Sequence, residues 1–158
     1  MNKPFTKYVC DVCGETIDSS KAMLQWAQQP TQASADNSYL EELKYIRIRC
    51  KKKSCYSPLE NKAIRENLHS QWLQLDDCLG SEKIDEVLTF PLGRIITTEM
   101  RKPFLEICRR LTLPYYEEAR TFFSVANEDG FYNIGDYLKG YICWSPEALK
   151  EIIQKYSK

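Results

Sequence analysis

Two pairs of cysteines constrain this chain more than any other feature of its sequence. Two residues separate Cys10 from Cys13, four separate Cys50 from Cys55, and 36 lie between the pairs. A Zn²⁺ ion takes four tetrahedral ligands, and structural zinc sites use cysteine pairs about two to four residues apart. Gly14 follows the first pair and supplies the positive φ angle of a tight turn. The spacing therefore predicts one structural zinc ion held by all four cysteines.

A redox dithiol is the competing interpretation of the first pair. Such a motif normally opens a helix in a βαβ unit, whereas residues 7–10 read as a short strand that enters a turn. The chain has seven cysteines, an odd number that suits thiols and metal thiolates of a reducing compartment better than a disulfide framework. We therefore favour metal binding and expect a cytoplasmic protein. No signal peptide or apolar run of about 20 residues is expected to take the chain to a membrane.

Residues 7–57 resemble the zinc-ribbon class through these cysteines and the strands that carry them. The resemblance implies a small β-hairpin module in which Cys10, Cys13, Cys50 and Cys55 are the zinc ligands. The second knuckle is wider than the commonest zinc-ribbon pattern, and a polar insertion separates the two pairs. The zinc is expected to be structural, because four protein sulfurs leave no open coordination position.

The apolar period changes from two to about 3.6 after Cys55. Residues 43–50 alternate, with Ile46 and Ile48 on one face and Arg47 and Arg49 on the other. Helical stripes follow, and their apolar members are Ile64, Leu68, Trp72 and Leu75; Ile84, Val87 and Leu88; Phe104, Ile107, Cys108 and Leu111; Tyr115, Ala119, Phe122, Phe123 and Ala126; and Leu149, Ile152, Ile153 and Tyr156. The pattern predicts an α+β protein, with a zinc-bound β module at 1–57 and an α-helical domain at 58–158.

A basic run next to the second cysteine pair indicates nucleic acid as one candidate partner. The candidate contact residues are Tyr45, Arg47, Arg49, Lys51, Lys52 and Lys53. In this interpretation the cations hold phosphates and the tyrosine ring stacks on a base. In the competing interpretation the cations are solvated or offset the formal charge of −2 on a zinc ion with four thiolates.

An aromatic surplus in the second half of the chain resembles the composition of a protein-binding surface. The candidate partner-contact residues are Tyr115, Tyr116, Phe131 and Tyr132. An aromatic core explains the same residues equally well. A helix-turn-helix reader of DNA is disfavoured here, because Glu117 and Glu118 at the start of the second helix would be repelled by phosphate.

The remaining chemistry-bearing residues predict no further site. His69 is the single histidine, which excludes any catalytic mechanism that needs two histidines. The acidic stretch at 76–86 lacks the spacing of a calcium loop and is expected to be solvated. Three further cysteines, Cys78, Cys108 and Cys143, stand apart from the paired motifs and are expected to be inert thiols.

Two functional classes survive these considerations. The 22 basic and 22 acidic side chains cancel, and the sequence carries no Walker, Rossmann or hydrolase motif. We therefore expect a non-enzymatic zinc-binding protein that acts as a protein–protein interaction or adaptor module. A regulatory protein that binds nucleic acid through Arg47–Lys53 is the alternative. We expect no membrane partner, and the sequence does not predict an oligomeric state.

Overall fold

A four-stranded sheet with helices on both faces forms the centre of the molecule. The structure is a computed structural model and describes residues 3–30, 41–80, 83, 90, 94–131 and 145–157. The sheet has the order β5-β3-β4-β6, in which only the β4–β6 pair is parallel, and β1 and β2 form a separate antiparallel hairpin. The strands are β1 (Lys7–Val9), β2 (Thr16–Asp18), β3 (Ala22–Pro30), β4 (Glu41–Cys50), β5 (His69–Gln74) and β6 (Arg94–Ile95).

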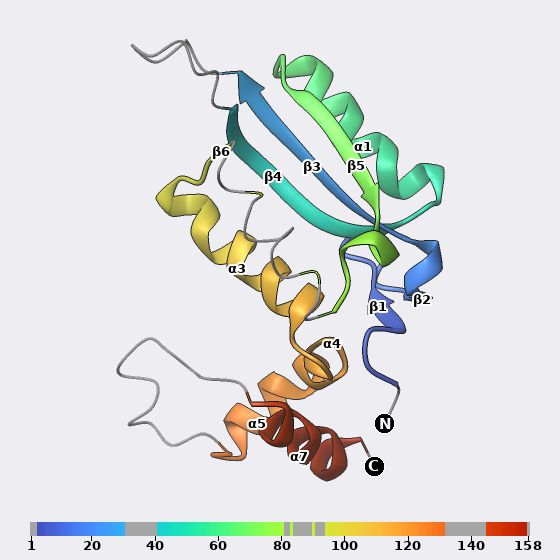
Figure 1. The fold of residues 1–158 in the computed structure, drawn as a ribbon, viewed down its shortest axis with the longest axis vertical. Helices are drawn as coiled ribbons and strands as arrows, with labels where there is room; N and C mark the ends of the chain where they lie inside the picture. The colour runs from blue at the N-terminus through green and yellow to red at the C-terminus, as the bar shows by residue number, and fades with distance from the viewer. Residues whose placement is uncertain are drawn as a thin grey trace.

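The helices flank this sheet or follow it in the chain. They are α1 (Lys53–Arg65), α3 (Thr98–Thr112), α4 (Tyr116–Ala119), α5 (Phe123–Glu128) and α7 (Pro146–Tyr156), with 3₁₀ turns η1 (Ser19–Lys21), η2 (Leu75–Cys78) and η5 (Arg120–Phe122). Helix α1 covers one face of the sheet and α3 the other (Figure 1). The mixture of sheet and helices that the sequence predicts is confirmed.

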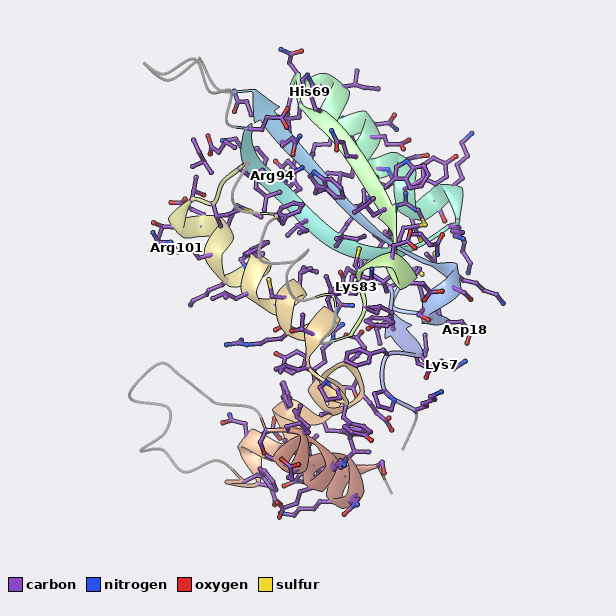
Figure 2. The ribbon with its side chains drawn as sticks, in the orientation of Figure 1. Lys7, Asp18, His69, Lys83, Arg94 and Arg101 are labelled. Atoms are coloured by element: carbon purple, nitrogen blue, oxygen red, sulfur yellow. The ribbon has the colours of Figure 1, made fainter. Side chains whose placement is uncertain are left out.

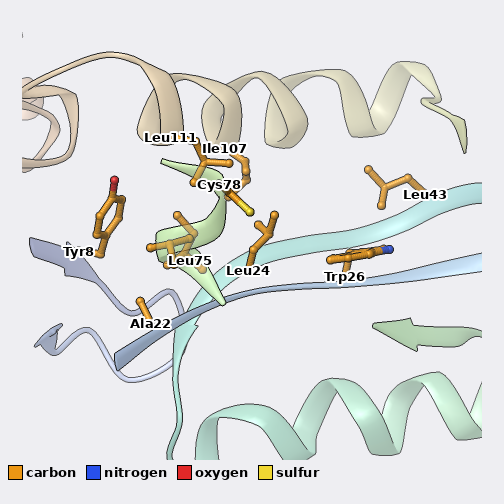
Figure 3. Packing of buried hydrophobic residues seen from close by; sticks show 10 residues of the cluster. Tyr8, Ala22, Leu24, Trp26, Leu43, Leu75, Cys78, Ile107 and Leu111 are labelled. Carbon is orange, nitrogen blue, oxygen red and sulfur yellow. The ribbon is translucent and has the colours of Figure 1, made fainter. Parts of the chain in front are cut away.

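The main hydrophobic core lies between the sheet and α3. Leu24 and Trp26 project from β3, and Ile107 and Leu111 meet them from the helix (Figure 3). Ile48 of β4 belongs to the same core. All five side chains are buried, and each one contributes roughly 1.5–3 kcal/mol to folding. The predicted stripe at 104–111 is thus the buried face of a longer helix, which includes Pro103.

Strand β4 has the two faces that its alternating sequence predicts. Ile46 and Ile48 belong to the core beneath α3, whereas Arg47 contacts the backbone of α1. A register shift leaves Lys44 without a partner opposite β3 and brings Leu43 into the same core as Ile48. This irregularity fits a β-bulge, which shifts side chains by one position relative to the two faces.

The predicted helical stripe through Leu68 and Trp72 is wrong. Helix α1 ends at Arg65, and Asn67 then takes a left-handed conformation with φ of 53°. Residues 69–74 form β5, in which Trp72 lies opposite Gln25 of β3. Apolar residues three or four positions apart occur in strands as well as in helices. Here hydrogen bonding to β3 makes the segment a strand.

The second half of the chain therefore contributes to the sheet as well as to the helices. Strands β5 and β6 both follow residue 58, so the order of a β module and then purely helical structure is corrected. Helix α1 begins at Lys53 and contains Pro58, so the predicted division after residue 57 falls inside this helix. The division into two domains stays a prediction.

The C-terminal helices enclose a second, smaller core. Tyr116, Ala126, Leu149 and Ile152 are buried there. Helix α7 begins as its sequence predicts, with the Ser145 side chain accepting a hydrogen bond from the Ala148 amide. The stripe at 115–126 is divided among α4, η5 and α5 instead of forming one helix. The predicted helix around 84–88 lies outside the described residues.

Candidate metal centre

The fold brings together the four cysteines that the sequence singles out. The Sγ atoms of Cys10, Cys13, Cys50 and Cys55 all lie within 4.8 Å of one another. A tetrahedral zinc ion with Zn–S bonds of about 2.3 Å needs sulfur atoms about 3.8 Å apart, so small adjustments suffice to bind it. Cys13 is exposed and the other three cysteines are buried. The cluster is thus a candidate metal centre with three buried ligands and one that reaches the surface.

The first pair lies in the tight turn between β1 and β2. The Gly14 amide donates to the Cys10 carbonyl at 2.9 Å, and the Cys10 amide donates to the Glu15 carbonyl at 2.9 Å. Gly14 has φ of 74°, and a Cβ atom added there would meet nothing within 4 Å. The turn therefore requires glycine for its backbone angle and not for space.

The second pair lies where β4 passes into α1. Cys50 ends the strand, Cys55 lies in the first turn of the helix, and the Cys50 amide donates to the Cys10 Sγ at 3.3 Å. Burial disfavours the Cys10 thiolate, but surrounding backbone amides outweigh it and lower the pKa of Cys10 to about 7. Burial raises the pKa of Cys55 to about 12. A bound zinc ion would deprotonate its thiol ligands outright.

Asp11, inside the first knuckle, fixes the knuckle against β4. Its amide donates to the Ile48 carbonyl at 2.9 Å, and its Oδ2 accepts from the Ile48 amide at 2.6 Å. The Arg110 Nη1 of α3 donates to both oxygens of Asp11, at 2.7 and 2.8 Å. Asp11 thereby connects the metal knuckle to the sheet and to a distant helix.

Arg110 is the centre of a buried ion network that sequence analysis missed. It is 2% exposed, and its Nε donates to Glu117 at 2.6 Å. The Arg110 Nη2 also donates to the Val9 carbonyl at 2.9 Å, while the Val9 amide donates to Glu117 at 2.8 Å. Burial disfavours the guanidinium charge, but Glu117 and Asp11 outweigh it and raise the pKa of Arg110.

This network also buries Glu117, one of the two acids that begin α4. The residue is buried beside β1 and also accepts from the Arg120 Nε at 2.9 Å. The network joins distant residues, and Asp11 and Arg110 are 99 positions apart in the sequence. No local sequence pattern carries a signal for such a pairing.

The two arginines of the basic run support the second cysteine pair from the α1 side of the sheet. Arg47 Nη2 donates to the Cys55 carbonyl at 2.9 Å, and Arg49 Nη1 donates to the Cys50 carbonyl at 3.0 Å. Both guanidinium groups also donate to the buried Gln25 Oε1. Burial lowers the pKa of each arginine, and the neighbouring thiolates partly offset this effect. These contacts favour the interpretation in which the arginines serve the metal.

The remaining members of the run divide between the α1 interface and the surface. The Tyr45 hydroxyl donates to Glu66 at 3.0 Å, and the Lys62 ammonium lies 4.1 Å from the Tyr45 ring centroid. Lys52 forms an ion pair with Glu15 beside the knuckle. Lys51 and Lys53 are exposed. The predicted face of Tyr45, Arg47 and Arg49 therefore packs against α1, and its contact with nucleic acid stays a prediction.

The predicted aromatic surface lies partly in the core. Tyr116 is 2% exposed and donates to Glu106 at 2.7 Å, so its side chain is part of the core, which favours the aromatic-core interpretation; its contact with a partner stays a prediction. Tyr115 and Phe131 are half-buried at the edge of the C-terminal core. Tyr132 lies outside the described residues.

No other predicted site gathers ligands in the part of the chain that the structure describes. The four cysteines are the one group of histidine, cysteine or acidic side chains there close enough to share a metal ion. His69 is exposed at the start of β5, 3.1 Å from Glu41 and at the opposite end of the sheet from Cys50 (Figure 2). Cys78 and Cys108 belong to the main core, and Cys143 lies outside the described residues.

Comparisons with known proteins give no relative from which a function of the cysteine cluster could be inferred. No protein-family model, curated protein or solved structure matches the chain. Within the described ranges, no helix has both the length and the apolar character needed to cross a bilayer.

Proposed function

We propose that Cys10, Cys13, Cys50 and Cys55 bind one structural zinc ion in a zinc-ribbon-like centre. The mutual proximity of the four sulfur atoms carries this proposal. Four thiolates in a tetrahedral arrangement suit zinc or iron, and zinc needs no redox partner. The Cys50 amide that points at Cys10 is the kind of donor that stabilises a metal thiolate.

The zinc would fasten three elements at one end of the molecule. The first pair belongs to the β1–β2 hairpin, Cys50 to β4 and Cys55 to α1. The formal charge of −2 on the ion with its thiolates would be offset by Arg47, Arg49 and Lys52, which lie around it. Because four sulfur ligands leave no position for water or substrate, the ion would organise structure and take no part in a reaction.

We further propose that the protein acts by binding a protein partner, as a small adaptor. Charge supports a protein over nucleic acid: the 22 basic and 22 acidic residues cancel, and Arg47, Arg49 and Lys52 already have partners within the chain. Among the described members of the predicted contact surface, Tyr115 and Phe131 stay accessible, half-buried at the edge of the helical core.

Salt dependence of binding tests the choice of partner class. Duplex and single-stranded DNA and RNA would be titrated with the purified protein at low and at roughly physiological salt. The adaptor proposal predicts no binding that survives physiological salt, because few cations of the run are unpaired. Tight binding that is abolished by replacing Lys51 and Lys53 with alanine would contradict the adaptor and favour the nucleic-acid alternative.

A further inference from the structure

A hollow of about 480 Å³ lies beside the metal centre, on the α1 side of the sheet. Its volume falls within the range of about 300–1,000 Å³ that small-ligand sites occupy. Strands β3, β4 and β5, helix α1 and the link between β4 and α1 contribute to its wall, whose polar and aromatic members are Arg49, Lys51, Tyr56, Glu60, Trp72 and Gln74. None of these residues is one of the four proposed zinc ligands, although Arg49 also donates to the Cys50 carbonyl.

Arg49 brings a buried positive charge to this hollow. It is 4% exposed, its two hydrogen bonds go to the neutral oxygens of Gln25 and Cys50, and its guanidinium lies 5.4 Å from the Tyr56 ring centroid. Among the described residues its guanidinium forms no ion pair, although Glu60 also lines the hollow. The Nη2 group of Arg49 donates to no acceptor among the described residues, so an anionic ligand in the hollow would supply a charge-assisted partner for it.

Lys51 and Trp72 add a second charge and a flat ring. Lys51 Nζ donates to the Ser20 carbonyl at 3.1 Å and meets no carboxylate among the described residues. Trp72 is 57% exposed on the edge strand β5, so most of its indole surface faces solvent. An exposed indole beside two cations matches a ligand that combines a planar ring with an acidic group.

We propose that this hollow binds a nucleotide, with the base stacked on Trp72 and the phosphate held by Arg49 and Lys51. The Arg49 guanidinium supplies charge-assisted hydrogen bonds to phosphate oxygens. Glu60 and Gln74 supply acceptors and donors for sugar hydroxyls or a base edge. A free nucleotide and one nucleotide of a single strand present the same chemistry, and the experiment separates these two sources.

Titration of the full-length protein with two probes tests the proposal. The probes are adenosine 5′-monophosphate, followed by calorimetry, and a labelled short oligothymidylate, followed by fluorescence anisotropy. Trp72→Ala should weaken binding roughly tenfold, because it removes the stacking surface. Lys51→Ala should weaken it severalfold and lower the salt slope of strand binding by about 0.7.

Two matched variants serve as controls. Ile64→Ala replaces an exposed apolar residue of α1 that is not part of the hollow's wall, and Lys53→Ala replaces another lysine of the same basic run. Both should bind like the wild-type protein. Trp72→Phe should restore part of the affinity that Trp72→Ala loses.

The possible results test the nucleotide proposal independently of the zinc proposal and of the adaptor proposal. Binding of the monophosphate identifies a free nucleotide, and binding of the oligonucleotide alone identifies a strand; either result, if lost in Trp72→Ala, supports the hollow as the site. Tight strand binding would at the same time contradict the adaptor proposal. Absence of saturable binding to both probes, or unchanged affinity in Trp72→Ala, would overturn the inference whatever the zinc content of the samples.

Discussion

Arg110 shows how much of this structure depends on a single side chain. It reaches Asp11 in the metal knuckle, Val9 in β1 and Glu117 in α4 at the same time. All of these contacts join segments that are far apart in sequence or belong to different elements. The guanidinium is suited to this task, because its five N–H donors form a planar fork and lysine offers only a point charge.

Replacing Arg110 by methionine should destabilise the protein by roughly 3–5 kcal/mol, because Glu117 keeps only the partly exposed Arg120 as a charged partner. Urea unfolding followed by circular dichroism measures the change. Arg101→Met, at the exposed start of α3, is the matched control and should change stability by less than about 0.5 kcal/mol. A loss below about 1 kcal/mol for Arg110→Met would contradict the role given to the network.

Among the elements, α7 has the clearest local start signal. Ser145 accepts from the Ala148 amide at 3.2 Å, and Pro146 occupies the first turn. Ser145→Ala should therefore cost about 1 kcal/mol of unfolding free energy. Ser157→Ala at the other end of the helix is the control, since its side chain caps nothing in the structure. Equal stability of the two variants would refute the capping argument.

The contact between α5 and α7 should depend on pH. Lys155 and Tyr156 hold the pKa of Asp129 below its ordinary value through hydrogen bonds to the carboxylate. A lowered folded pKa means that the stabilisation is complete above the unfolded value of about 3.9 and is lost as the pH falls through the lower folded value.

Asp129→Asn should consequently unfold at lower urea than the wild type at pH 7. The difference should shrink to nothing in acid, and because the pair is exposed it should also shrink at high salt. Glu151→Gln, on the exposed side of α7, controls for the loss of one negative charge. A difference that stays constant from pH 7 into acid would show that the Asp129 charge is not responsible.

The elements differ in how far their sequence predicts them. The alternation in β4 and the cap of α7 are confirmed because each signal is local and agrees with the tertiary structure. For β5 the sequence predicts a helix, because the spacing of Leu68, Trp72 and Leu75 fits a helical period. The hydrogen bonding to β3 that makes it a strand is not encoded in any local pattern. The candidate site divides in the same way. The spacing of the cysteines predicts the metal ligands, but no local pattern predicts the contacts of Arg110.

At the scale of the whole molecule, the metal centre lies where the hairpin, the sheet and α1 meet. The Asp11–Arg110 contact connects it further to α3, and Glu117 connects it to α4. Loss of the metal should therefore weaken more than the knuckle. Metal binding is coupled to folding wherever the ligands come together only in the folded chain.

Removal of the metal by a chelator at neutral pH should lower the melting temperature of the entire protein in one transition. Cys108→Ser, which alters a thiol in the main core, should still show this drop on chelation, because Cys108 is not a ligand. Cys13→Ser should melt at low temperature with or without chelator. A wild-type melting curve that a chelator leaves unchanged would show that the centre does not contribute to folding.

The metal content of the purified protein is the most direct test of the central claim. Elemental analysis should find one zinc per chain in the wild type and in Cys108→Ser, and little or none in Cys50→Ser and Cys55→Ser. Iron in place of zinc, or the absence of any metal from a folded wild-type protein, would contradict the structural zinc centre and return the four cysteines to redox chemistry.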